Sequence, residues 1–222
     1  MPVDDNGLDI TSGIQNYPDA RFALITPAHQ SPLGVALSLA RRHQILEWAD
    51  RSQAWIIEDD YDSEFRYHGK PLPALKSLDA PQRVIYAGTF SKALFPALRC
   101  AWLVVPVKQI TQFRHQASLA PCAVPVLWQN TLADFLREGH FWRHLKKMRQ
   151  HYAQRRQWIE QALTQQGFQV VPQKGGIQMV IRMIGDDIAH ARKANAAGLA
   201  VQALSDWRIR SSGEGGLLLS FT

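Results

Sequence analysis

The chain has 222 residues, enough for one large domain or two small ones, and its 46% hydrophobic and 20% charged residues are ordinary for a globular protein. No apolar run approaches the roughly 18 residues of a membrane-spanning helix. The acidic N-terminus lacks the apolar stretch of a signal peptide. The two cysteines, Cys100 and Cys122, fit no disulfide framework and no metal site. These features exclude a membrane protein and a disulfide-rich secreted domain, and they favour a cytoplasmic protein without a metal.

The net charge of +6 is compatible with contact to nucleic acid or to anionic ligands. Much of the positive excess lies between Arg143 and Arg156 at helical spacing. Such spacing is more typical of a solvated helix face than of a DNA-binding surface. The charge alone therefore does not assign a partner.

The first half of the chain predicts alternating strands and helices. Residues 1–19 are rich in Gly, Asp and Asn, which predicts a loop. Ser38 is expected to cap a helix that runs to Asp50. Apolar, β-branched runs predict strands at 21–26, 54–58, 83–87 and 101–106. The order strand, helix, strand favours parallel pairing with a right-handed crossover, and hence an α/β fold with a mainly parallel sheet.

The second half predicts long helices followed by a small domain. Helices are expected at 126–137 and 140–166, each ended by a glycine, Gly139 and Gly167. Further strands are expected at 169–172, 178–183 and 217–221, with a helix at 188–197. We therefore expect residues 1–150 to form part of a large domain, including the start of the long helix. Residues 151–222 are expected to form its end and a small α+β domain.

A single lysine, Lys92, lies where a predicted strand gives way to a turn. Thr89 and Ser91 precede it, and Arg99 follows seven residues later. In open α/β sheets, ligands bind at the carboxyl ends of strands. Hydroxyls and an arginine suit a phosphate, and a lysine in a poorly solvated site can form a Schiff base. Together these groups describe a site for pyridoxal 5′-phosphate.

A second motif supplies the groups that the pyridoxal ring requires. The predicted strand at 54–58 runs into Asp59, Asp60 and Tyr61. A carboxylate that faces the pyridine nitrogen keeps the nitrogen protonated, so that the ring withdraws electrons. Asp59 and Tyr61 are two positions apart in an extended segment and therefore point to the same face. Asp59 is the expected ring partner, and the adjacent Asp60 is the alternative.

Three blocks in this order resemble the fold-type I aminotransferases. They are Thr-Pro-Ala-His-Gln-Ser-Pro-Leu-Gly (26–34), Ile-Glu-Asp-Asp-Tyr-Asp-Ser-Glu-Phe-Arg-Tyr (57–67) and Gly-Thr-Phe-Ser-Lys-Ala-Leu-Phe-Pro-Ala-Leu-Arg (88–99). More narrowly, these blocks and residues 138–156 resemble the aminotransferase-like domain of MocR/GabR-type bacterial transcriptional regulators. The resemblance implies pyridoxal 5′-phosphate as a Schiff base on Lys92, with Asp59 at the pyridinium, Tyr61 at the ring oxygen, and Thr89, Ser91 and Arg99 at the phosphate. Gln30 is a candidate for the place near the ring oxygen where related aminotransferases have an asparagine, and His29 is expected to be structural.

One position departs from the resembled pattern. Aminotransferases of this kind clamp the substrate carboxylate with an arginine near the last strand, where this chain has Leu218. Arg208 and Arg210 lie earlier, around a Gly-rich turn. We therefore expect a regulator's effector domain, which binds an amine or amino-acid effector or senses the cofactor itself. The alternatives are a class I/II aminotransferase, in which Lys92 acts as the general base, and an inactive truncated fragment.

The resemblance also implies segments beyond this sequence. Regulators of this type carry a winged helix-turn-helix domain and the front of the aminotransferase domain upstream, and a further helix downstream. DNA is therefore expected to be bound only through the absent N-terminal domain, and no membrane partner is expected. A homodimer of the full-length protein is expected by analogy with fold-type I proteins.

Overall fold

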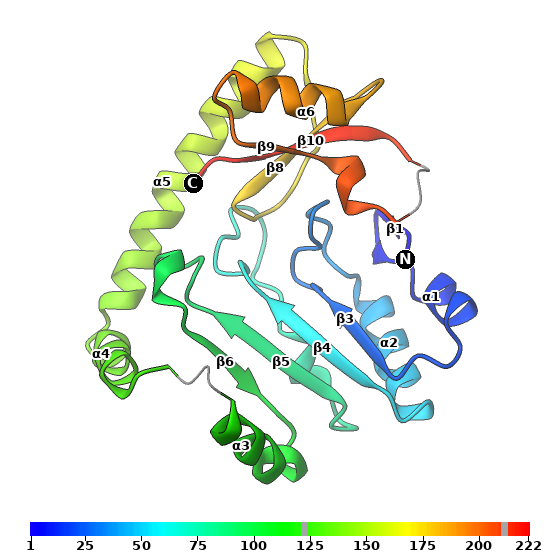
Figure 1. Ribbon diagram of the computed structural model, residues 1–222, viewed down its shortest axis with the longest axis vertical. Coiled ribbons are helices and arrows are strands. Elements are labelled where there is room, and N and C mark those ends of the chain that lie inside the picture. The colour runs from blue at the N-terminus through cyan, green and yellow to red at the C-terminus, as the bar shows by residue number, and fades with distance from the viewer. Residues whose placement is uncertain (121–123, 210–212) are drawn as a thin grey trace. The chain divides into compact units, whose positions relative to one another are not determined.

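The computed structural model describes residues 1–120, 124–209 and 213–222. Its elements alternate as expected of an α/β protein (Figure 1). None of the helices in the described part is long and apolar enough to cross a bilayer. By their contacts, the residues fall into two compact units. The first unit is Met1–Gln30, Val35–Glu64 and Pro71–Leu145, and the second is Ser31–Gly34, Phe65–Lys70 and Lys146–Thr222.

The first unit is built on a sheet of four strands in the order β3 (Phe22–Ile25), β4 (Trp55–Asp60), β5 (Val84–Thr89) and β6 (Ala101–Val104). The first three strands are parallel, as the strand–helix–strand order predicts. Strand β6 is antiparallel to β5. The connection between them contains only a short 3₁₀ turn, η2 (Pro96–Leu98), and parallel pairing requires a longer crossover.

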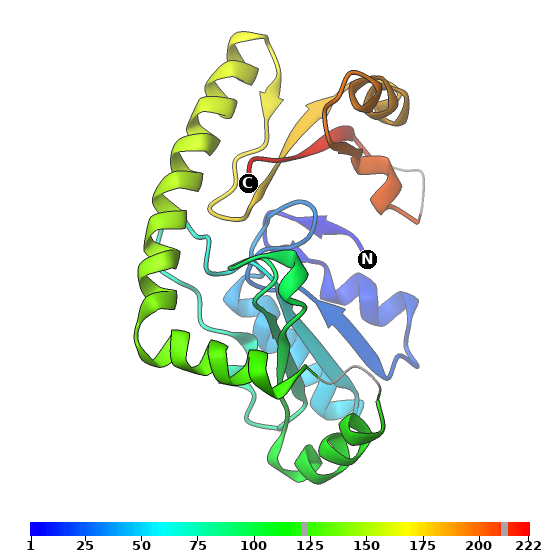
Figure 2. The same ribbon diagram turned by 60° about the vertical axis from the view of Figure 1, so that its left-hand side comes forward.

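Helix α2 (Leu39–Arg51) covers one face of this sheet (Figures 1 and 2). As expected, Ser38 caps the helix, and its side chain accepts a hydrogen bond from the Arg41 amide at 3.5 Å. The core of the unit lies between this helix and the sheet, where apolar side chains of both are buried. It contains Ile25, Ile45, Leu46, Ala49, Ile56, Leu75 and Val84.

The expectation of a loop at residues 1–19 is wrong. The segment forms a small hairpin of β1 (Val3–Asp4) and β2 (Gly7–Leu8), followed by helix α1 (Ile10–Asn16). Asp9 caps this helix by accepting a hydrogen bond from the Ser12 amide at 3.1 Å. Ile10 is buried in the core against α2. A cap and one tertiary anchor thus order a segment whose composition resembles that of a loop.

The rest of the first unit is helical. The turn η3 (Val107–Gln109) leads into α3 (Ile110–Leu119), and α4 (Val126–Arg137) precedes the long helix α5 (His140–Gln165). Both predicted glycine stops are confirmed, because Gly139 and Gly167 adopt the left-handed backbone that ends a helix, with φ of 75° and 82°.

The second unit contains the main part of α5 and an antiparallel sheet. Its strand order is β7 (Gln169–Val170), β8 (Gln178–Met183), β10 (Gly215–Ser220) and β9 (Val201–Ala203). Helix α6 (Asp187–Ala196) packs on this sheet, and η4 (Leu204–Trp207) follows β9 (Figure 2). The buried side chains between helix and sheet are Ile181, Ala191, Val201, Ala203 and Leu217.

Candidate functional site

The predicted site residues of the first unit lie at one edge of its sheet. Strands β3, β4 and β5 are parallel, so their carboxyl ends meet at the same edge (Figure 1). Gln30, Tyr61 and Lys92 each follow one of these ends. Strand β6 runs in the opposite direction and starts opposite Thr89, which brings Arg99 to the same edge. The carboxyl edge of a sheet of this kind is where ligands bind.

The adjacent acids of β4 differ in their surroundings. The Asp60 carboxylate accepts hydrogen bonds from the Ser63 amide at 3.3 Å, the Ser63 hydroxyl at 2.8 Å and the Tyr86 hydroxyl at 2.8 Å. The Asp59 side chain is half-buried, and within residues 1–120, 124–209 and 213–222 it has no hydrogen bond or ion pair. Asp60 is therefore committed to local structure, whereas Asp59 is available to a ligand.

The electrostatics of Asp59 favour a cationic partner. Burial raises the pKa of the Asp59 carboxyl, and the nearby carboxylates of Asp60 and Asp62 raise it further. A half-buried acid beside two others holds its proton more tightly than usual. A cation placed against it would relieve both the burial and the repulsion. A protonated pyridine nitrogen has this chemistry.

Tyr61 is held from two sides by one residue, His29. The Tyr61 hydroxyl donates a hydrogen bond to the His29 carbonyl oxygen at 3.2 Å, and the His29 Nδ1 lies 3.1 Å from the same hydroxyl. The carboxylate of Asp62 also lies 3.1 Å from this Nδ1. From the sequence, His29 was expected to be structural, and Asp62 was not among the expected site residues. The only sequence signal for Asp62 was its place directly after the predicted site residue Tyr61.

The turn that carries Lys92 is fixed by aromatic packing. Gly88 leaves room for the Trp102 ring, which a Cβ at that position would strike. Phe90 packs on Trp102 with ring centroids 4.5 Å apart, and its edge meets Phe141 at 5.6 Å. These contacts hold the backbone on both sides of the turn, so the exposed Lys92 starts from a defined position.

Of the four side chains expected at the Schiff base and the phosphate, three make no polar contact among the described residues. In the described part of the chain, the Ser91 hydroxyl, the Lys92 amine and the Arg99 guanidinium have no hydrogen bond or ion pair. Arg99 also adopts a left-handed backbone with φ of 50°, which is uncommon for a residue with a side chain. Thr89 is different, because its hydroxyl accepts from the Ser91 amide at 3.1 Å and donates weakly to the Cys100 carbonyl at 3.4 Å.

Gln30 follows β3 at the same edge of the sheet. Its backbone amide donates to the Val35 carbonyl at 3.0 Å, which closes a turn after the strand. Its side chain is half-buried.

Leu218, at the position of the expected carboxylate-binding arginine, is part of a core. It is buried in the second unit among Val180 and Leu204. Of the two arginines weighed as substitutes, Arg208 donates a hydrogen bond to the Glu214 carbonyl oxygen, and Arg210 lies outside the described residues.

The remaining chemically active groups do not form a site. Cys100 is buried and free, and Cys122 lies outside the described residues. Over the residues that the structure describes, no group of three or more His, Cys, Asp or Glu side chains could hold a metal ion.

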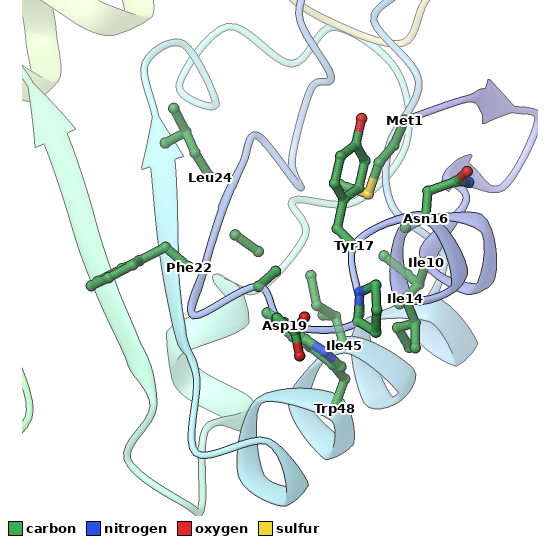
Figure 3. A pocket seen from close by; sticks show the side chains of 14 residues that line it. Met1, Ile10, Ile14, Asn16, Tyr17, Asp19, Phe22, Leu24, Ile45 and Trp48 are labelled. Atoms are coloured by element: carbon green, nitrogen blue, oxygen red, sulfur yellow. The ribbon is translucent and has the colours of Figure 1, made fainter.

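A separate apolar pocket of about 600 Å³ lies beside α1 (Figure 3). None of the predicted site residues lines it. Its walls come from the N-terminal segment with α1, from β3 and from α2, and include Met1, Ile10, Tyr17, Phe22, Leu24 and Trp48. Its lining is mostly apolar, with Asn16, Tyr17 and Asp19 as polar residues.

Comparisons with known proteins identify the family of the chain. The family described as "Aminotransferase class I and II" matches residues 4–212. The probable rhizopine catabolism regulatory protein MocR of Rhizobium meliloti is 42% identical over 155 residues, 70% of this chain and 31% of that protein. The HTH-type pyridoxine biosynthesis transcriptional regulator PdxR of Corynebacterium glutamicum is 32% identical over 222 residues, all of this chain and 48% of that protein.

A solved structure has the same fold. The kynurenine aminotransferase of Pyrococcus horikoshii superposes with a TM-score of 0.88 at 26% identity, over 100% of this chain and 58% of that chain. The chain thus spans less than half the length of either regulator and just over half of the enzyme.

Proposed function

Because this chain belongs to the aminotransferase class I and II family, we propose that it is the pyridoxal 5′-phosphate-binding effector domain of a MocR-type bacterial transcriptional regulator. One observation carries the proposal: the unpaired, half-buried carboxylate of Asp59 at the carboxyl edge of the sheet. The similarity to regulators, at 42% and 32% identity, is higher than the 26% identity to the kynurenine aminotransferase. This difference supports a regulator over an enzyme.

The residues at the edge fit the cofactor. Asp59 offers an anion whose pKa is raised by burial and by neighbouring acids, and the pyridinium nitrogen offers the cation that it lacks. Asp60, the alternative partner, already accepts three hydrogen bonds from Ser63 and Tyr86. The unengaged Ser91 hydroxyl and Arg99 guanidinium fit a phosphate.

Each residue has a distinct task in this proposal. When bound, the cofactor supplies an aldehyde that condenses with amines and a ring that withdraws electrons. The Lys92 amine attaches the cofactor covalently, and Asp59 keeps the ring nitrogen protonated. Tyr61 and Gln30 orient the ring through its oxygen. Thr89 positions the Ser91 amide and contributes its hydroxyl to the phosphate site together with Ser91 and Arg99.

The class of effector follows from Leu218. A buried leucine provides no charge for a carboxylate, so the position used by the resembled aminotransferases is closed to that role. We therefore propose an effector that acts through its amine, or the cofactor itself. The relative PdxR is described as a regulator of pyridoxine biosynthesis, in keeping with the second possibility.

The wider activity of the parent protein belongs to the same proposal. DNA would be bound by a separate domain of a longer chain, because the two regulators are more than twice as long as the matched part. A homodimer and a cytoplasmic location are proposed by analogy with fold-type I proteins and bacterial regulators.

Titration of the chain with pyridoxal 5′-phosphate tests the proposal. We expect a visible absorbance band that survives dialysis and is absent in Lys92→Ala. Borohydride should fix the cofactor, and peptide mapping should find the label on Lys92. Lys108→Ala, which removes another exposed lysine, should behave like the unaltered chain. A label on a different lysine would overturn the site.

The same sample separates the alternatives. An aminotransferase should convert amino acids to 2-oxo acids in the presence of an acceptor 2-oxo acid, and we expect no such turnover. An inactive fragment should give no cofactor band. A band with no turnover is the outcome that the proposal requires.

A further inference from the structure

A buried histidine–aspartate contact lies directly beside Tyr61. His29 is 7% exposed and Asp62 is 2% exposed, and the His29 Nδ1 lies 3.1 Å from the Asp62 Oδ2. The same Nδ1 lies 3.1 Å from the Tyr61 hydroxyl, which in turn donates to the His29 carbonyl at 3.2 Å. Residues that are 32 positions apart in sequence therefore form one connected polar cluster beneath the sheet edge.

Burial of these polar side chains costs the fold free energy. Buried polar groups weaken a fold unless they are fully hydrogen-bonded. Here the His29 Nε2 and the Asp62 Oδ2 are buried and, in the described part of the chain, have no well-aligned hydrogen bond. Apolar side chains of similar volume would pack there at lower cost. The presence of these polar side chains is better explained if they orient the Tyr61 hydroxyl.

The geometry points the His29 Nδ1–H at the Tyr61 oxygen, with the Asp62 carboxylate at its side. A carboxylate beside an imidazole fixes which ring nitrogen carries the proton and how the ring is turned. The Nδ1–H bond then holds the phenol oxygen, while the phenol hydrogen can turn about the C–O bond. The hydrogen can therefore serve either the His29 carbonyl or an acceptor outside the cluster.

We propose that His29 and Asp62 are positioning residues for Tyr61. Asp62 orients the His29 ring, and the His29 Nδ1 holds the Tyr61 hydroxyl where it meets the ring oxygen of the cofactor. The inference rests on the proposed function, since it gives Tyr61 a bound pyridoxal 5′-phosphate to contact. It assigns His29 a role that its expected structural place in the sequence did not include.

A double-mutant cycle with pyridoxal 5′-phosphate tests this role. His29→Ala and Tyr61→Phe should each weaken cofactor binding about three- to tenfold, as expected for one lost hydrogen bond, and should shift the absorbance maximum alike. His29→Ala in the Tyr61→Phe background should add no further shift. His29→Asn, which keeps a donor near the Nδ1 position, should restore the affinity and the absorbance maximum of the unaltered chain. His43→Ala removes an exposed histidine on α2 and should have no effect.

A second readout needs no cofactor. The tyrosine ring resonance that disappears in Tyr61→Phe should move in His29→Ala and in Asp62→Asn, but not in His43→Ala. If His29→Ala does not fold, Asp62→Asn provides the same readout. The inference would be overturned if the Tyr61 resonance did not move in His29→Ala and Asp62→Asn. It would also be overturned if His29→Ala and Tyr61→Phe shifted the band additively, because His29 would then contribute to packing alone. Absence of any band in the unaltered chain would overturn the proposed function and this inference with it.

Discussion

The Asp60 carboxylate accepts a hydrogen bond from the Tyr86 hydroxyl at 2.8 Å, and this bond distinguishes Asp60 from its neighbour Asp59. Adjacent residues of a strand point to opposite faces of the sheet, so the two acids cannot share one partner. Burial raises the pKa of Tyr86, and the bond to Asp60 raises it further. Tyr86 therefore remains a protonated donor to Asp60, and Asp60 is tied to the sheet.

The first prediction follows from this difference. Asp59→Asn removes the negative charge and keeps the shape, so pyridoxal 5′-phosphate binding should weaken by about 1.5–3 kcal/mol, the range for a charge-assisted hydrogen bond. Asp60→Asn should leave cofactor affinity nearly unchanged and lower the melting temperature. Absorbance titration and thermal unfolding of both variants check this. The opposite pattern would show that Asp60 is the ring partner.

The second prediction concerns the stability of the cofactor-free protein. Burial, with Asp60 and Asp62 nearby, raises the folded-state pKa of Asp59, so the ionised carboxylate costs the folded state free energy near neutral pH. This cost is absent below the unfolded-state pKa of about 3.9 and grows as the pH rises through the folded-state value. Asp59→Asn should therefore raise the melting temperature at pH 7 by about 1–3 °C, after allowance for solvent screening at this half-buried site.

Thermal scans between pH 7 and pH 4 check this effect. The advantage of Asp59→Asn should shrink steadily as the pH falls. An Asn variant that is less stable than the parent at pH 7 would mean that the carboxylate already has a compensating partner.

The third prediction concerns Arg42, which is 3% exposed under the sheet. Its guanidinium donates to the carbonyl oxygens of Leu37 at 2.9 Å, Pro73 at 2.6 Å and Pro27 at 3.0 Å. Arg42→Ala removes all three hydrogen bonds, including those to the buried Leu37 and Pro27 carbonyls, and should destabilise the fold by about 3–5 kcal/mol in urea unfolding. Arg42→Lys should recover little, because an ammonium cannot reproduce the planar fork. Arg51→Ala, at the exposed end of α2, is the matched control.

The fourth prediction concerns Asp187 in the second unit. Burial acts to raise its pKa, but hydrogen bonds from the Gly216 amide at 2.9 Å and from the Ser205 hydroxyl and amide at 3.0 and 3.1 Å outweigh burial and lower it. A lowered folded-state pKa stabilises the fold above the unfolded value of about 3.9 and stops doing so as the pH falls through the folded-state value. Asp187→Asn should therefore be less stable than the parent at pH 7 and equal to it in acid.

Chemical unfolding at several pH values measures this difference. Asp206→Asn changes an exposed acid of the same unit and should show no such pH dependence. A stability difference for Asp187→Asn that is independent of pH would contradict the assignment.

The strands and long helices could be predicted because their signals are local. An apolar run predicts the strand β5 (Val84–Thr89). Helical periodicity and the glycine that follows predict α5. Helix α1 could not be found this way, since its order depends on the Asp9 cap and on burial of Ile10 against another helix. Its only sequence signal was an aspartate three residues before Ser12.

The candidate site could be predicted as a set of residue types, but not as a set of contacts. Sequence placed Asp59, Tyr61 and Lys92 at strand ends, and the parallel register brings those ends to one edge. The choice between Asp59 and Asp60 depends on Tyr86, which lies on the next strand. The pairing of His29 with Asp62 depends on residues from two different strand ends. Contacts of this kind arise only from the tertiary fold.

The last prediction concerns DNA. Helix α5 carries no acidic residue between His140 and Ile159, and its exposed side chains include Arg143, Lys146 and Lys147. A face of this kind contacts phosphates without reading bases, so DNA binding by this chain should be weak, independent of sequence and steeply lost with salt. If both lysines contact phosphate, Lys146→Gln with Lys147→Gln should flatten the slope of log K against log salt by about 2 units. Arg192→Gln with Lys193→Gln, on α6, should leave the slope unchanged. Tight, sequence-specific binding that persists at high salt would mean that this chain itself reads DNA.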